Sequence, residues 1–216
     1  YQVKEELEKL FVKREKEKGQ EHITKEKFDK IAEKYDVENK EKLLKDLHFL
    51  GISLWYEDME DFNMLVLNPE WISHGVYKII NWLNEEKRYS LALGGFVEVF
   101  KEDKERYPEN NHEFLYRLMM HYELAYKTRG GELIIPHLLK EDRPEELPDF
   151  PVGESLMLRY RAELPLPPIT VSRFIVRHHQ EIKDENQKYL VWRHGVVLED
   201  GSGCIALVRE EKNTIS

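Results

Sequence analysis

The chain has 216 residues, of which 41% are hydrophobic and 35% charged, a composition typical of a folded globular protein rather than a disordered one. It contains no apolar run near the roughly 20 residues that a membrane-spanning helix needs, and residues 1–20 hold no signal-like apolar block. The net charge is −9, and the acidic excess falls within residues 50–150, which disfavours nucleic acid as a partner. The single cysteine, Cys204, excludes an internal disulfide and a thiolate metal site, so we expect a reducing, cytoplasmic setting.

The first fifty residues predict three amphipathic helices. Apolar side chains recur at helical spacing within residues 3–18, and Gly19 is a suitable stop for that helix. Thr24 can cap a second helix, and a third is expected to end at Gly51. The side chains expected to face inward are Val3, Leu7, Leu10, Phe11, Phe28, Ile31, Ala32, Tyr35, Leu43, Leu44, Leu47 and Leu50.

Two strands and a long helix are predicted next. Residues 52–56 and 62–67 are rich in aromatic and β-branched side chains, and the acidic residues 57–61 form the turn between them. Asn68-Pro69-Glu70 is a well-formed helix start, with a capping side chain, a proline that needs no N–H bond and an acid at the positive end of the dipole. The buried face of this helix is expected to be Trp71, Ile72, Val76, Ile79, Ile80 and Leu83.

A similar helix and hairpin pattern recurs downstream. Residues 114–119 indicate a helix, and residues 124–128 and 133–136 indicate two strands joined by the tight turn Arg129-Gly130-Gly131-Glu132. The pattern predicts an α+β fold with two winged-helix-like helix–hairpin units in tandem. Chance similarity between two short hairpins is the alternative.

Residues 141–151 hold three prolines and five acids, which predicts an extended linker. We therefore expect a helical, winged-helix-like subdomain over residues 1–140 and a smaller α/β subdomain over residues 152–216. The latter is so short that we expect it to be truncated or to lean on the first subdomain. Its predicted elements are a strand at 156–160, a helix at 171–178, and strands at 190–192, 196–198 and 205–208, with a hairpin turn at 200–203.

We expect no catalytic, cofactor-binding or metal site in this segment. The chain has no Gly-x-x-x-x-Gly-Lys-Ser/Thr loop that could cradle a nucleotide phosphate. His178 and His179 are adjacent, so on a helix they point about 100° apart and do not easily share one ion. Ser73-His74 falls on an amphipathic helix rather than on the strained turn of a nucleophile.

The main alternative function is a winged-helix nucleic-acid-binding or signalling adaptor domain. In the first unit the wing would be residues 57–61, and four acids in five positions would be repelled by a phosphate backbone. Lys127 and Arg129 on the second wing are the only favourable pair.

Arginine and aromatic side chains gather in the C-terminal segment, a pattern found at protein interfaces. The interaction candidates are Arg159, Tyr160, Arg161, Arg173, Phe174, Arg177, His178, Trp192 and Arg193. An ordinary charged surface accounts for the same residues.

Several segments taken in order resemble the COR domain (C-terminal of Roc) of Roco-family GTPases, most of all its bacterial and archaeal members. The resemblance rests on residues 47–80, the run Ile134-Ile135-Pro136-His137-Leu138-Leu139, Arg143-Pro144-Glu145, the helix Arg173-Phe174-Ile175-Val176-Arg177, and residues 191–198. It covers nearly the whole chain.

The resemblance implies a non-catalytic regulatory and dimerisation module. In that family it packs on the preceding GTPase domain of the same polypeptide and couples the nucleotide state of that domain to oligomeric state. GTP or GDP would then bind only in the neighbouring domain, and a homodimer would form through the C-terminal subdomain. The segment carries no GTPase domain and ends before the family's second subdomain would normally finish, so we expect a weakened or absent dimer here.

Overall fold

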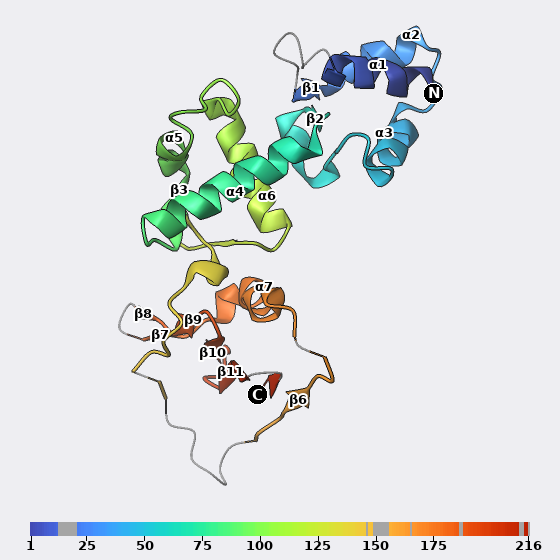
Figure 1. The fold of residues 1–216 in the computed structure, drawn as a ribbon. Helices are drawn as coiled ribbons and strands as arrows, with labels where there is room; N and C mark the ends of the chain where they lie inside the picture. The colour runs from blue at the N-terminus through green and yellow to red at the C-terminus, as the bar shows by residue number, and fades with distance from the viewer. Residues whose placement is uncertain are drawn as a thin grey trace. The chain divides into compact units, whose positions relative to one another are not determined.

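The structure, a computed structural model, describes residues 1–12, 21–145, 147–148, 156–164, 166–185, 188–211 and 214–215. It divides into two units, residues 1–78 and 79–216, and the boundary lies inside the long helix α4 (Pro69–Glu85) (Figure 1). Helices and short strands mix in both units, which agrees with the predicted α+β class. None of the described helices is long and apolar enough to cross a membrane.

The first unit starts with three helices whose ends obey local capping rules. They are α1 (Gln2–Val12), α2 (Lys25–Lys34) and α3 (Lys40–Phe49). The hydroxyl of Thr24 accepts the N–H of Lys27 at 3.3 Å and caps α2, as predicted. Gly51 follows α3 with a φ of +67°, in the left-handed region that favours glycine. The end of the first predicted helix, residues 13–18 and Gly19, lies outside the described residues.

The three helices pack on two short paired strands, β1 (His22–Thr24) and β2 (Met64–Val66). The core of the first unit consists of Val3, Leu7, Ile23, Phe28, Ile31, Ala32, Leu44, Leu47, Trp55, Leu65 and Leu67. Most of these were expected to face inward. Leu50 was too, but this prediction is wrong because its side chain is 65% exposed. The side chains of Leu10 and Phe11 lie outside the described part.

The first predicted hairpin does not form. Residues 52–56 contribute one bridge, in which Leu54 and Val66 exchange backbone hydrogen bonds of 2.8 and 2.9 Å. The expected turn folds instead into a 3-10 helix, η2 (Glu57–Phe62). Strand β2 pairs with β1, placing Ile23 opposite Leu65. The winged-helix description is therefore not confirmed, because β2 takes its partner from a segment some forty residues earlier.

The second helix–hairpin unit forms as predicted. Helix α6 (His112–His121) leads into β4 (Tyr126–Lys127) and β5 (Glu132–Ile134), and a third strand, β3 (Ser90–Ala92), pairs with the other side of β5. Around them lie α5 (Phe96–Val99) and the 3-10 helices η3 (Leu93–Gly95), η4 (Glu109–Asn111) and η5 (Pro136–Leu138). Residues 141–145, 147 and 148 form neither helix nor strand, and the rest of the predicted linker is outside the described residues.

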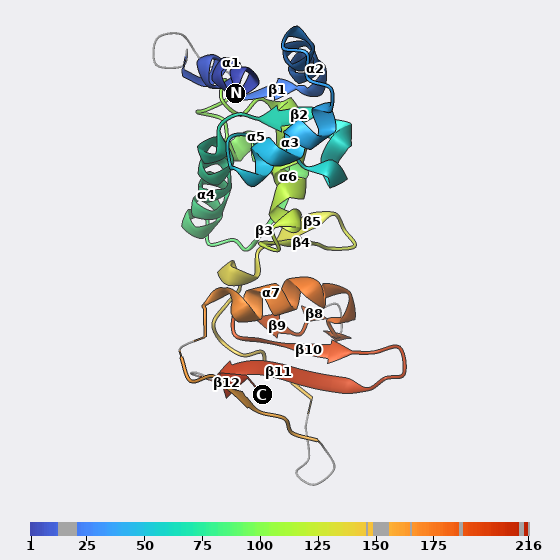
Figure 2. The same cartoon turned by 90° about the vertical axis from the view of Figure 1, so that its right-hand side faces the viewer.

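The C-terminal segment forms an antiparallel sheet with one helix beside it. The sheet order is β6 (Tyr160–Arg161), β12 (Thr214–Ile215), β11 (Ile205–Glu211), β10 (Gly195–Glu199) and β9 (Val191–Trp192). Helix α7 (Ile169–Arg177) lies along this sheet in Figure 2, followed by η6 (His179–Glu181) and the small hairpin of β7 (Asp184–Glu185) and β8 (Lys188–Tyr189). The strand predicted at 156–160 is wrong except for its last residue.

Candidate functional site

Within the second unit, the helix–hairpin segment 112–139 packs against residues 169–198 of the C-terminal segment. We call this region of contact the seam. Its apolar centre is a shared cluster of buried side chains, formed by Tyr126, Ile134, Leu139, Val171, Ile175, Val176, Ile182, Val196 and Leu198. Helix α7 thus buries its apolar face against both the sheet and the helix–hairpin segment.

An ion cluster on Glu123 spans the seam. Its carboxylate accepts hydrogen bonds from Arg177 Nε at 2.6 Å and Arg177 Nη2 at 3.0 Å, and Arg173 Nε lies 3.0 Å from the same group. The two arginines are four residues apart on α7 and therefore share one face of the helix. Hydrogen bonding to Arg177 holds the pKa of Glu123 below its ordinary value. Glu123 also has a φ of +56°, which is uncommon outside glycine, so the backbone just after α6 is strained where it presents this carboxylate.

A ring contact forms a second link across the seam. The rings of Tyr126 and His179 stack with centroids 5.1 Å apart and planes at 27°. The Nδ1 atom of His179 donates to the backbone oxygen of Val176 at 2.8 Å, which fixes the ring beneath the tyrosine. Tyr126 itself is only 4% exposed, so this contact is part of the core.

Arg193 makes a third link, between the turn after β9 and the end of the helix–hairpin segment. Its backbone N–H donates to the oxygen of Lys140 at 2.9 Å, and its guanidinium pairs with Glu141. Its Nε is buried and has no hydrogen-bond partner among the described residues.

The structure separates the predicted interaction residues into three groups. Arg173, Arg177 and Arg193 form ion pairs with residues of this same chain. Phe174 lies on α7 and His178 directly follows this helix, with ring centroids 4.5 Å apart. These five contribute to, or lie next to, an internal seam.

The other four predicted residues take part in none of the ion pairs described above. Trp192 is buried at 4% exposure, and a side chain at Gly195 would clash with its ring, since a Cβ there would lie 2.3 Å from Cζ2. Arg159, Tyr160 and Arg161 are exposed on or beside the edge strand β6. Nothing in the structure tests any of the nine as contacts with another molecule.

Sequence reasoning missed Glu123, Tyr126 and His179. Glu123 is one acid among many, and its partners Arg173 and Arg177 are about fifty residues away, so spacing carries no signal. His179 was considered only as a metal ligand, and Tyr126 only as a strand residue. A stacked pair across a seam is visible only once the fold is known.

An exposed apolar strip includes β6 and the residues on both sides of it in the chain. Its members, with their exposed fractions, are Leu156 (87%), Met157 (66%), Leu158 (57%), Tyr160 (71%) and Leu164 (76%). Strand β6 is the last in the order of its sheet and pairs with β12. Contiguous exposed apolar side chains beside a sheet edge are typical of protein–protein contacts.

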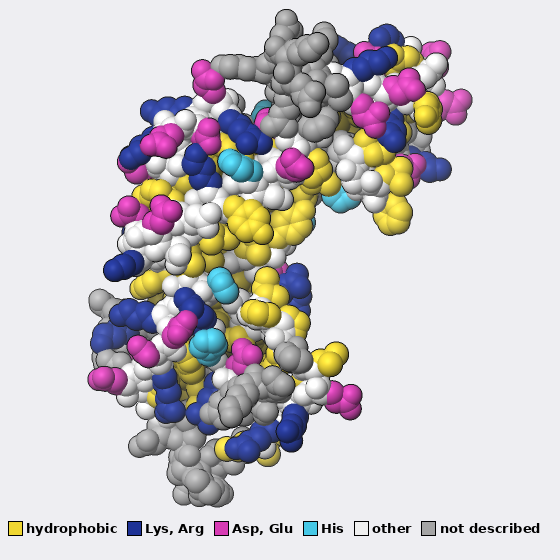
Figure 3. Space-filling model, in the orientation of Figure 1, with side chains coloured by type: hydrophobic (Ala, Val, Ile, Leu, Met, Phe, Trp, Pro, Cys, Tyr) yellow, Lys and Arg dark blue, Asp and Glu magenta, His cyan; other side chains and the backbone are white. Residues whose placement is uncertain are grey.

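The described surface does not favour the nucleic-acid alternative. Lys and Arg side chains are interspersed with Asp and Glu over α1 to α3 in Figure 3, and Lys45 is paired with Glu57 at 2.8 Å. A phosphate backbone needs a basic stripe instead. The described residues also contain no group of three or more His, Cys, Asp or Glu side chains that could hold a metal ion.

Comparison with known proteins identifies the family. The family model described as "C-terminal of Roc, COR-A domain" matches residues 1–139, and the model described as "C-terminal of Roc, COR-B domain" matches residues 153–216. A Roc-COR-CHAT protease from an unknown prokaryotic organism is 26% identical over 192 residues, which is 85% of this chain and 17% of that protein. A probable serine/threonine-protein kinase, qkgA, from Dictyostelium discoideum is 28% identical over 120 residues, 56% of this chain and 7% of that protein.

Among solved structures, the RocCORdC fragment of Methanosarcina barkeri Roco2 bound to GDP matches at 29% identity and a TM-score of 0.49, covering 62% of this chain and 43% of that one. The chain spans less than a fifth of the length of the two curated relatives described above. The two family models together cover most of the chain, in the order COR-A then COR-B. The chain belongs to the C-terminal of Roc family and is a COR domain of Roco proteins.

Proposed function

We propose that this COR domain is a non-catalytic regulatory and dimerisation module of a Roco-type GTP-binding protein. In this proposal it packs on a neighbouring GTPase domain, follows the nucleotide state of that domain, and couples it to oligomeric state. Nucleotide binds in the neighbouring domain, and this chain supplies no catalytic group. Family membership and the Roc domain named beside COR in the prokaryotic relative support the proposal.

One observation carries the dimerisation half of the proposal, namely the apolar strip beside β6. Five large apolar side chains there are between 57% and 87% exposed. Burying such side chains contributes about 25 cal/mol per Å² of apolar surface, so covering the strip with a second copy favours association. A sheet edge also lets a second copy add backbone hydrogen bonds.

The seam supports the coupling half. The shared apolar cluster and the Glu123 ion cluster tie COR-A's helix–hairpin segment to α7, and α7 packs on the sheet that ends in β6. A displacement of the helix–hairpin segment is therefore transmitted through packed side chains to the sheet that carries the strip. If the helix–hairpin segment and α7 can pack in two arrangements, and the bound nucleotide favours one of them, nucleotide binding and dimerisation are linked by a coupling free energy.

Sedimentation of the intact chain over a range of concentrations tests dimerisation. We expect a monomer–dimer equilibrium that the double substitution Met157→Glu and Leu158→Glu shifts to monomer, because charges would then be buried at the contact. Phe49→Glu is the matched control, since Phe49 is 88% exposed in the first unit. A chain that stays monomeric at every concentration contradicts the proposal, as does dissociation by Phe49→Glu alone.

Titration against the chain's own GTPase domain, loaded in turn with GDP and a non-hydrolysable GTP analogue, tests coupling. We expect two different affinities, whose ratio gives the coupling free energy. Glu123→Gln should bring that ratio closer to one. Equal affinities in wild type would leave a scaffold without a switch.

A further inference from the structure

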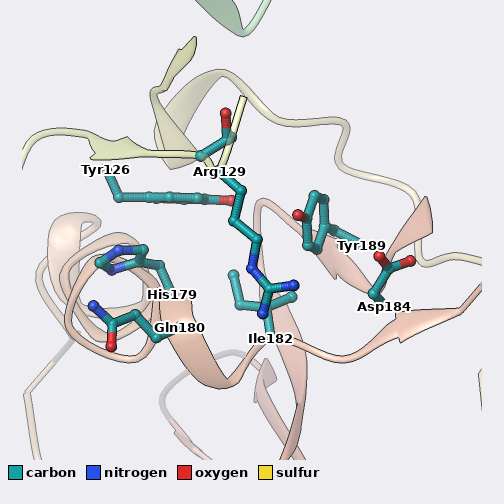
Figure 4. Close-up of a pocket in the computed structure, with 8 residues that line it drawn as sticks. Tyr126, Arg129, His179, Gln180, Ile182, Asp184 and Tyr189 are labelled. Carbon is teal, nitrogen blue, oxygen red and sulfur yellow. The ribbon is translucent and has the colours of Figure 1, made fainter. Parts of the chain in front are cut away.

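A pocket opens at the seam, beside the Tyr126–His179 contact. One wall comes from the COR-A hairpin, with Tyr126, Thr128 and Arg129. The other comes from η6, β7 and β8 of COR-B, with His179, Gln180, Ile182, Asp184 and Tyr189. Figure 4 shows these side chains around the opening. Its volume is about 390 Å³, within the range of small-molecule sites. We call it the seam pocket.

The seam pocket contains a buried hydroxyl with no partner. The side chain of Tyr126 is 96% buried, and its hydroxyl has no hydrogen bond to any described residue. Burial, reinforced by the neighbouring Tyr189, raises the pKa of Tyr126, so the phenol keeps its proton at neutral pH and its hydroxyl is a hydrogen-bond donor. In Figure 4 the phenol oxygens of Tyr126 and Tyr189 lie on either side of the Arg129 side chain. Since buried donors are normally satisfied and no described residue accepts from this hydroxyl, it points to an acceptor supplied by a ligand.

Two opposite charges line the same pocket. Within the described residues, neither the guanidinium of Arg129 nor the carboxylate of Asp184 takes part in an ion pair. Arg129 and the two phenols form a set of donors that suits a carboxylate. Asp184 supplies an acceptor that suits an ammonium group. The presence of Asp184 disfavours a phosphate dianion, and the presence of Arg129 disfavours a bare metal cation.

We propose that the seam pocket binds a small zwitterion of the α-amino-acid class. The carboxylate of the ligand accepts from Arg129 and from the hydroxyls of Tyr126 and Tyr189, and its ammonium group donates to Asp184. The ligand's side chain lies toward Ile182 and the tyrosine rings. Because the ligand touches both the COR-A hairpin and COR-B, it stabilises the seam by mass action.

The first test is saturation-transfer NMR on the intact chain with each of the twenty L-amino acids, followed by calorimetry on those that bind. We expect at least one to bind with a Kd of about 1 mM or tighter. The matched carboxylic acid without the amino group and the matched amine without the carboxylate should each bind about tenfold more weakly or worse. Absence of binding by all twenty, or binding of inorganic phosphate in their place, overturns the proposal.

Two variants assign the ends of the ligand. Arg129→Gln should weaken the amino acid and the carboxylic acid by about tenfold while leaving the amine unchanged. Asp184→Asn should weaken the amino acid and the amine while leaving the acid unchanged. Lys127→Gln is the control, because Lys127 is exposed on β4 and does not line the pocket. Tighter amino-acid binding after Asp184→Asn would overturn the assignment.

Tyr126→Phe separates a ligand-binding role from a structural one. The ring and its stacking on His179 are kept, and only the unpartnered hydroxyl is removed. We expect weaker amino-acid binding with an unchanged or higher Tm of the unliganded chain, because the lost hydroxyl has no partner among the described residues. A lower Tm without ligand would mean that the hydroxyl is satisfied within the chain, and that result would remove the main support for the site.

Discussion

Two segments of the chain have a helix followed by two stretches that were predicted as strands: α3 with residues 52–67, and α6 with residues 124–136. Only the second segment forms a β-hairpin. In the second unit the connection is tight. The N–H of Thr128 donates to Glu132 at 2.8 Å, and Gly131 adopts a φ of +84°. In the first unit the connection has no glycine, and residues 57–62 fold into a 3-10 helix instead. A hairpin thus depends more on its turn than on strand-forming residues on either side.

The two segments also differ in the additional strand with which each one pairs. Strand β2 of the first unit pairs with β1, while β5 of the second unit pairs with both β4 and β3. In each case the added strand has three residues and precedes a helix or a 3-10 turn. Long-range pairing therefore completes both small sheets, and in the first unit it replaces the hairpin.

Matched leucine substitutions give the largest expected effect on this comparison. Leu65 and Leu133 are the central residues of β2 and β5, at 0% and 1% exposure. Replacing either with alanine should cost about 2–5 kcal/mol in the free energy of unfolding, because each leaves a cavity. Hydrogen exchange should rise mainly in the unit that carries the change. A loss of protection spread evenly over both units would contradict the division at α4.

Glycine substitutions should have the next largest effect. Gly51 after α3 and Gly131 in the β4–β5 turn both have positive φ. Alanine at either position should cost about 1–2 kcal/mol, measured by urea unfolding, because a Cβ disfavours this conformation. Gly94→Ala is the control, since no atom lies within 4 Å of its Cβ position and its φ is not positive. Equal stability of the Gly131 and Gly94 variants would show that the turn relaxes without cost.

Local features were predictable from sequence and long-range ones were not. The cap at Thr24, the stop at Gly51 and the helix start at Asn68 depend on neighbours within four residues. The structure has all three, and Asn68 Oδ1 accepts the N–H of Glu70 at 3.1 Å. The prediction of the first hairpin was wrong because the aromatic and β-branched residues at 52–56 favour a strand but do not determine which segment it pairs with.

The seam lay beyond sequence reasoning for the same reason. Glu123 and Arg177 are 54 residues apart, and no period or motif connects them. The arginines of α7 were predicted as candidates for contact with another molecule, and the sequence could not say that Arg173 and Arg177 pair with Glu123 of this chain. Family resemblance supplied the identity of the domain, and the structure supplied the pairing.

The pH dependence of the β1–β2 pairing should be a smaller effect. His22 pairs with Val66, and burial lowers its pKa below 6.5, opposed by Glu21. Between that lowered pKa and 6.5 the unfolded chain binds more protons, so stability rises with pH. The contribution is complete above 6.5 and is lost as pH falls through this window. NMR titration of His22, together with urea midpoints of wild type and His22→Gln, measures it. A His22 pKa above 6.5 would contradict this assignment.

The Glu123 ion cluster should give the smallest change in stability, because its groups lie at the surface. The pKa of Glu123 is held below 4.5 in the folded chain. Its contribution to the free energy of unfolding is therefore present above pH 4.5 and is lost as pH falls through the lowered pKa. Glu123→Gln should therefore reduce stability slightly at neutral pH and leave it unchanged in acid. Urea unfolding at both pH values provides the measurement.

Hydrogen exchange decides whether this cluster acts on the seam or only on its own surface. Glu123→Gln should raise amide exchange in α7, because the anchor for Arg173 and Arg177 is weakened. Glu98→Gln is the matched control, since Glu98 pairs with Lys101 at 2.7 Å within a single turn of chain. If neither substitution changes exchange in α7, the apolar cluster alone holds the seam. The coupling between COR-A and COR-B would then rest on packing, and its sensitivity to Glu123 would disappear.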